Sequence, residues 1–142
     1  MGQKVNVREN LNAYLSEVRD TAFEWGKNDC FTFTNNAFHA MYGEGWADDW
    51  LGRYMSGNVV LRRKELIDEF GSRSFVGAVD KKLKRIDYTP PLGALVTTKE
   101  CQRWIIGVAM GICTGTKAVF LSKDGTLHLP LDDVHQAWVK EI

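Results

Sequence analysis

The sequence has 142 residues, with 18 Lys and Arg balanced by 18 Asp and Glu, and 44% of its residues are hydrophobic. This balance lacks the basic excess of a nucleic-acid-binding surface. The longest uncharged apolar stretch, from Trp104 to Cys113, is shorter than the ~20 residues of a membrane-spanning helix. No secretory signal is evident, and three cysteines do not form a disulfide framework. We therefore expect one domain over residues 1–142 that is made in a reducing interior, binds no nucleic acid and has no membrane span.

Helical periodicity dominates the first part of the chain, about residues 8–88. Leu11, Leu15 and Val18 recur at helical spacing and predict a helix over ~8–20. A second helix begins at Cys30 and ends near Gly43. Residues 43–54 are too rich in Gly and Trp for a regular element, and they predict a structured loop whose aromatic rings cover the core. A third helix is expected from Ser56–Asn58 to Gly71, and a fourth, capped by Ser72 or Ser74, is expected to carry Phe75, Val79 and Leu83.

The pattern changes at Pro90-Pro91, and about residues 92–142 are expected to form an antiparallel sheet. The segments that favour strands are 92–98, 104–113, 116–121 and 126–129. Gly107 and Gly111 in the second of them indicate a close approach or a bulge. Lys123-Asp124-Gly125 is a hairpin turn signal, residues 131–136 are expected to form one short helical turn, and residues 137–142 could close the sheet. Helices followed by antiparallel strands predict an α+β fold.

Cys30 stands at the start of the second helix, directly after Asp29. Backbone N–H groups and the positive end of the helix dipole favour a thiolate there, and the thiolate is the form of cysteine that attacks substrates. A buried, inert cysteine with Asp29 as an ordinary N-cap explains the same residues. Cys30 is thus a candidate nucleophile or a core residue.

Four segments resemble the NlpC-type, papain-like cysteine peptidase superfamily. Trp25-Gly26 followed by Asp29-Cys30 is similar to the start of the family's catalytic helix. Residues 91–96 are similar to its P-x-x-G-D-L-V strand, and residues 105–111 are similar to its H-V-G-I-Y-L-G strand. The closing Gly125, Leu129-Pro130-Leu131 and Ala137-Trp138 resemble a phage tail protein branch with an F-x-W-G-x-x-D-C start. The resemblance implies a papain-like fold, with N-terminal helices packed on a small antiparallel sheet, and a place in a phage tail.

Two departures from this family concern its catalytic residues. Ile105 stands where the family has its histidine base, and Ala94 stands where it has Asp. A cysteine nucleophile needs a base nearby, and isoleucine cannot serve. His39 lies nine residues beyond Cys30 on the opposite helix face. His128, on the strand before Pro130, is either a partly exposed strand residue or a substitute base, and His135 falls in a polar turn.

The aromatic residues of the 43–54 loop are candidates for partner binding as well as for packing. Trp is enriched at protein interfaces, so Trp46, Trp50, Arg53 and Tyr54 form a candidate interface loop, with loop packing as the alternative for Arg53 and Tyr54. A sugar-binding platform is a further use of several tryptophans. No His, Cys, Asp or Glu pair has ligand spacing, so we expect neither metal nor cofactor.

Two functions of different classes compete as explanations of the sequence. The first is a structural component of a bacteriophage tail tip or baseplate, a virion protein made in the bacterial host cytoplasm, which has kept a peptidase-like fold without its chemistry. Its partners would be other tail proteins of the tail hub and distal tail region. The second is an active peptidoglycan hydrolase, a cysteine peptidase or amidase that cleaves stem peptides during phage entry, with His128 or a partner's residue as base. An assembly factor absent from the finished particle is a third option.

Overall fold

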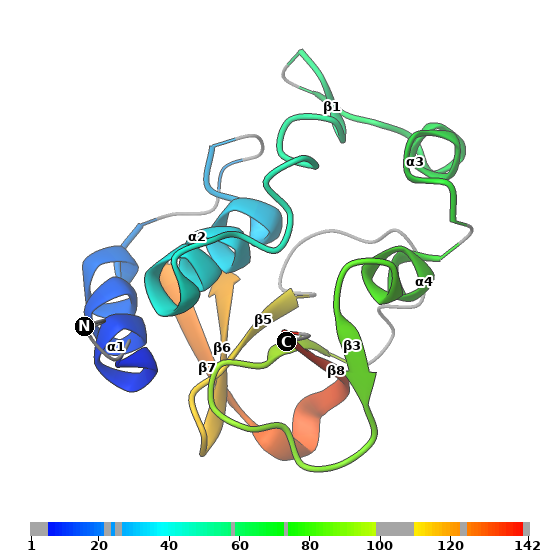
Figure 1. The fold of residues 1–142 in the computed structure, drawn as a ribbon. Helices are drawn as coiled ribbons and strands as arrows, with labels where there is room; N and C mark the ends of the chain where they lie inside the picture. Colours follow the sequence, from blue (N-terminus) through cyan, green and yellow to red (C-terminus); the bar gives the residue numbers. More distant parts are fainter. Residues whose placement is uncertain are drawn as a thin grey trace, which may run out of the picture.

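The structure is a computed structural model that describes residues 6–21, 24, 27–57, 59–72, 74–98, 110–122 and 125–140. The four α-helices of the described residues lie between Val7 and Asp80, and the main antiparallel sheet follows between Lys84 and Val139, which confirms the α+β class (Figure 1). Helices α1 and α2 lie side by side over one face of the sheet, and α4 lies near its other end, beside β3.

Local capping signals set the ends of the helices. Asn6 caps α1, and Ser74 caps α4 by accepting the Gly77 N–H at 3.0 Å. Gly43 and Gly71 end α2 and α3 in the left-handed region, with φ of 81° and 67°, where glycine is favoured because it has no Cβ. The helices are α1 (Val7–Val18), α2 (Cys30–Tyr42), α3 (Arg63–Phe70) and α4 (Phe75–Asp80).

The expected helix start at Ser56–Asn58 is wrong. Strands β1 (Met55–Ser56) and β2 (Val59–Val60) form a small antiparallel hairpin there, and α3 begins only at Arg63. Gly57 between the strands has a φ of 61°, a conformation that ends a right-handed helix but suits a turn. The Leu61 N–H donates to the Tyr54 carbonyl at 2.8 Å and closes the hairpin at its base.

Six strands form the main sheet in the order β3-β8-β4-β5-β6-β7, and every neighbouring pair is antiparallel. Strand β8, the last element of the chain, lies between β3 and β4 in the sheet. A 3-10 turn, η1 (Leu131–Asp133), precedes it. The strands are β3 (Lys84–Ile86), β4 (Leu95–Thr98), β5 (Met110–Cys113), β6 (Lys117–Ser122), β7 (Gly125–Pro130) and β8 (Val134–Val139).

Most of the strands predicted from the sequence are therefore confirmed, with two corrections. The helical turn expected over 131–136 covers only η1, and residues from Val134 onward pair with β4 as a strand. The segment 84–86 was expected to lie in the helical part, but it pairs with β8. Of the strand expected over 104–113, only Met110–Cys113 belongs to the described residues, so Ile105 lies outside them.

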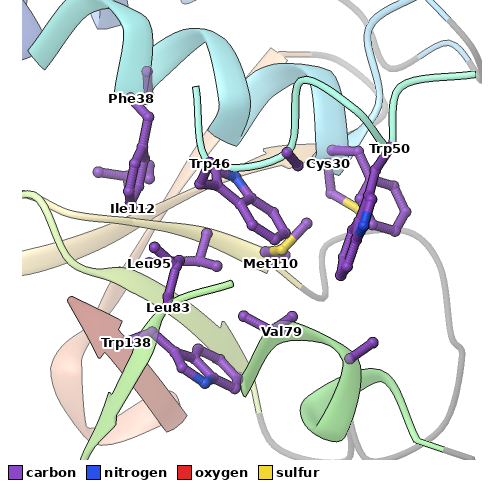
Figure 2. Close-up of a cluster of buried hydrophobic side chains, with 14 of the residues drawn as sticks. Cys30, Phe38, Trp46, Trp50, Val79, Leu83, Leu95, Met110, Ile112 and Trp138 are labelled. Atoms are coloured by element: carbon purple, nitrogen blue, oxygen red, sulfur yellow. The ribbon is translucent and has the colours of Figure 1, made fainter. Parts of the chain in front are cut away.

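The core lies between the helices and the sheet. From α2, the buried side chains of Ala37, Phe38 and Met41 pack with Leu95 of β4 and Ile112 of β5. Trp138 of β8 is fully buried in the same cluster (Figure 2). Its indole N–H donates to Asp80 of α4 at 2.8 Å.

A second cluster forms on the opposite face of the sheet, around Val96, Cys113 and Phe120. The Phe120 ring lies across Gly111 of β5, where any Cβ would collide with the ring and with the Val119 carbonyl. The close approach predicted at Gly111 is thus confirmed.

Candidate functional site

The N-terminus of α2 is built by a reciprocal cap around Asp29. Its Oδ1 accepts the Thr32 N–H at 2.9 Å, and its own N–H donates to the Thr32 Oγ1 at 2.7 Å. This capping box fixes the first turn of the helix, so Cys30 is the first helical residue. The position expected for Cys30 is confirmed, with the helix dipole directed at it.

Cys30 nevertheless lies inside the core. Its side chain is 2% exposed and belongs to the same cluster as Trp46, Trp50 and Met110 (Figure 2). Figure 2 shows Cys30 beneath α2, facing the space that Met110 of β5 and the two indoles also occupy. A nucleophile must reach a substrate carbonyl, so this conformation does not present the sulfur for attack.

Tyr54 packs against the N-terminus of α2, where it contacts the residues on either side of Cys30. Its hydroxyl donates to Oδ2 of Asp29 at 2.5 Å, and its ring stacks on Phe31 at 4.4 Å. Asp29 and Tyr54 are 0% and 1% exposed. Burial raises the pKa of Tyr54 well above its usual range, and so do the hydrogen bond to Asp29 and the charges of Asp29 and Cys30. Tyr54 thus joins the end of the 43–54 loop to the N-cap of α2 through a buried hydrogen bond.

Further hydrogen bonds fasten residues 43–54 along α2. The Trp46 indole N–H donates to Thr34 Oγ1 at 3.1 Å, and that hydroxyl donates to the Cys30 carbonyl at 2.7 Å. Asn35, 1% exposed, donates to Asp48 at 2.7 Å and accepts the Ala47 N–H at 2.7 Å. Together with the bond from Tyr54 to Asp29, these bonds hold the loop to α2 at Asp29, Thr34 and Asn35.

The three histidines of the chain lie away from the buried cluster around Cys30. His39 is exposed and contacts Asp48 at 2.6 Å through Nε2, and nine residues of helix separate it from Cys30 by about 13.5 Å along the axis. His128 is exposed on edge strand β7, two strands from β5, which corresponds to about 10 Å. His135 is exposed on β8 and lines a different cavity. The structure does not bring Cys30 and His128 together in this cluster.

The candidate interface residues are mostly core residues. Trp46, Trp50 and Tyr54 are 6%, 5% and 1% exposed, which confirms the prediction that the loop's aromatic rings cover the core. Arg53 is half-exposed, binds Glu69 of α3 at 2.7 Å and lies over the Phe70 ring. The rings of Trp46, Trp50 and Tyr54 therefore have almost no exposed surface for a partner to contact, because they pack in the core of this molecule.

Sequence reasoning missed the pairing of Asp29 with Tyr54 and that of Asn35 with Asp48. The first pair is 25 positions apart in the sequence and the second is 13 apart, so no local pattern links either pair. The described residues contain no group of three or more His, Cys, Asp or Glu placed to hold a metal ion. Within the same residues, no helix has the length and apolarity needed to cross a membrane.

Comparison with known proteins places the chain in one family. The model of a domain of unknown function, DUF6950, matches residues 3–139, so the chain belongs to the DUF6950 family. No curated protein matches the sequence.

Proposed function

We propose that this protein is a structural component of a bacteriophage tail tip or baseplate, built on a papain-like, NlpC-type fold that no longer catalyses peptide hydrolysis. The resemblance of the Trp25-Gly26 and Asp29-Cys30 segment, of residues 91–96 and of the closing segment supports the phage assignment. An α2 that begins at Cys30 and packs on an antiparallel sheet is compatible with such a fold. Other tail proteins of the hub and distal tail region would be its partners.

The burial of Cys30 is the observation that carries the inactive assignment. A peptidase nucleophile is reached by substrate and held as thiolate by a neighbouring base. Here Cys30 is 2% exposed and belongs to one buried cluster with Trp46 and Trp50, and the histidines are exposed at other places. These features of the α2 N-terminus suit a cysteine packed in the core better than a catalytic nucleophile.

An active cysteine peptidase acting on peptidoglycan is the second candidate. The position of Cys30 at the first turn of α2 favours it, because this is where a helix best stabilises a thiolate. Activity would require residues 43–54 to withdraw from α2, and a base supplied by His128 or by a partner.

The deciding experiment is Cys30→Ala in a phage that encodes this protein. We expect particles that contain the protein, assemble normally and infect at nearly the wild-type level. Cys113→Ala is the matched control, since it removes the same atoms from another buried cysteine. Particles of the Cys30 variant that assemble but cannot cross the cell wall, with the control unaffected, would make the protein an enzyme. Virions that lack the wild-type protein would refute the structural role.

A further inference from the structure

A cavity of about 480 Å³ lies on the opposite side of β8 from the candidate site. It is bounded by β3 and the segment that follows it, by η1, and by the first half of β8. Its apolar lining comes from Ile86, Leu131, Val134 and Ala137. These side chains belong to the second cluster, on the face of the sheet turned away from α2.

The rim of this cavity is acidic. Asp87 and Asp132 line it, Asp133 follows directly in the chain, and no Lys or Arg is among the lining residues. Within the described residues these three carboxylates are exposed and make no ion pair or hydrogen bond, whereas most of the other carboxylates bind a cation or a donor. The rim therefore presents carboxylates without a Lys or Arg among the lining residues, together with the imidazole of His135, above an apolar floor.

Tyr88 adds an aromatic surface beside these carboxylates. Its side chain is 62% exposed, the largest exposure of any bulky hydrophobic residue in the described part of the chain. An aromatic face next to carboxylates suits a guanidinium group, which stacks on rings and binds carboxylates through its fork of N–H donors. Lysine would use the charge but not the planar stacking.

Among the described residues, β3 forms the sheet edge at this cavity, and the opposite edge is protected. Strand β3 is paired on one side by β8, and no described strand pairs with its other side. At the far edge, the Thr126 N–H of β7 already donates to the Arg19 carbonyl at 3.0 Å, and Pro130 has no N–H to offer. A segment that approached β3 could place a side chain in the neighbouring cavity.

We infer that this cavity binds an arginine side chain on an extended segment of a partner protein. The guanidinium would lie between Asp87 and Asp132 and against the Tyr88 ring, and its aliphatic stem would cover the apolar floor. Charge complementarity selects this occupant. The inference goes beyond the proposed function, because it names the chemistry of a partner whether or not the assembly is a phage tail.

Titration of the ¹⁵N-labelled full chain with the peptide acetyl-Gly-Val-Arg-Val-Gly-amide tests it. We expect amide shifts concentrated at residues 86–90 and 131–137, weakened by added salt because surface charges are screened. The same peptide with citrulline in place of arginine keeps the shape but loses the charge. It should bind at least about fivefold more weakly. Equal affinity of the two peptides, shifts centred elsewhere, or no shifts at millimolar peptide would overturn the inference.

Variants then test the named residues. Asp87→Asn combined with Asp132→Asn should lower the affinity for the arginine peptide about tenfold, and Tyr88→Ala should lower it several-fold. Asp68→Asn combined with Glu9→Gln, at two exposed acids of α3 and α1 outside the cavity, is the control for the same change in net charge. An equal loss in this control would reduce the effect to non-specific attraction and reject the site. Failure of these binding tests would leave the virion experiment on Cys30 unaffected, so the two proposals can fail separately.

Discussion

The Tyr54 hydroxyl donates to Oδ2 of Asp29 at 2.5 Å, and both groups are buried. This hydrogen bond joins the end of the 43–54 loop to the N-cap of α2. Trp46 and Asp48 bind the same helix farther along, at Thr34 and Asn35. The cap that positions Cys30 is therefore also the anchor of the loop that covers it, and the sulfur cannot be exposed without breaking these contacts.

Tyr54→Phe should destabilise the protein by about 1.5–3 kcal/mol. The substitution keeps the ring that stacks on Phe31 but removes a donor to a buried carboxylate, and hydrogen bonds to charged groups contribute at this level. Urea denaturation measures the loss. Tyr88→Phe is the matched control, because it removes the same hydroxyl from an exposed ring, and it should change stability by less than about 0.5 kcal/mol. Equal stability of the two variants would show that the Asp29 bond contributes nothing net.

Stability should fall as the pH rises above about 10. Burial raises the pKa of Tyr14, Tyr42 and Tyr54 above the usual value near 10, with the Glu17 charge adding at Tyr14 and the Asp29 bond adding at Tyr54. Above pH 10 these tyrosines release protons in the unfolded chain and keep them in the folded one, so the folded state binds more protons and loses stability with increasing pH.

Each such tyrosine contributes up to about 1.4 kcal/mol per pH unit until its folded pKa is reached. Urea midpoints between pH 9 and 11.5 measure the slope. Tyr54→Phe should make it shallower, since one of the three groups no longer titrates. A slope that Tyr54→Phe leaves unchanged would contradict the role assigned to this hydroxyl.

Gly45→Ala should destabilise the protein by roughly 2–3 kcal/mol, at the upper end of overpacking costs. A Cβ at this position would collide with the side-chain oxygens of Asn35 and Asp48, which hold the loop to α2. Gly52→Ala is the comparison, because nothing lies within 4 Å of its Cβ and its cost comes from a φ of +86° alone, about 1 kcal/mol. Thermal or urea denaturation compares the two. A Gly45 variant no less stable than the Gly52 variant would contradict the steric argument.

The elements that could be predicted from the sequence are those specified locally. For α2, the cap, the apolar spacing and the closing Gly43 all lie within 15 residues, and both ends were predicted. At residues 55–60 the sequence predicts a helix start instead of the hairpin, because Ser56 and Asn58 can also cap a helix. The bond from the Leu61 N–H to the Tyr54 carbonyl, which closes the hairpin, depends on how the loop packs.

The candidate site was predictable only in part, for the same reason. Local sequence placed Cys30 at a helix start, but its burial is decided by Trp46, Trp50 and Met110, which reach it from other elements. The fold brings these residues together. The sequence predicts that the loop rings cover the core, but it does not show that Cys30 is among the residues packed with them. Whether Ile105 faces Cys30 stays a prediction, since Ile105 lies outside the described residues.

Cys30 should be almost unreactive toward 5,5′-dithiobis(2-nitrobenzoate) at pH 7 in the folded protein. The reagent must reach a thiolate, and Cys30 is 2% exposed in a cluster with Trp46 and Trp50 of the 43–54 loop. Labelling followed by peptide mass spectrometry assigns the modified cysteine. Cys113 is an internal comparison, because it is also buried and burial raises the pKa of its thiol.

Gly45→Ala should increase labelling at Cys30 and leave Cys113 unchanged, since it loosens only the loop. Ile105→His then tests the resemblance: faster labelling of Cys30 in this variant would support a vestigial catalytic site, and an unchanged rate would count against Ile105 as the former base position. Rapid labelling of Cys30 in the wild-type protein would contradict the closed site and favour the peptidase.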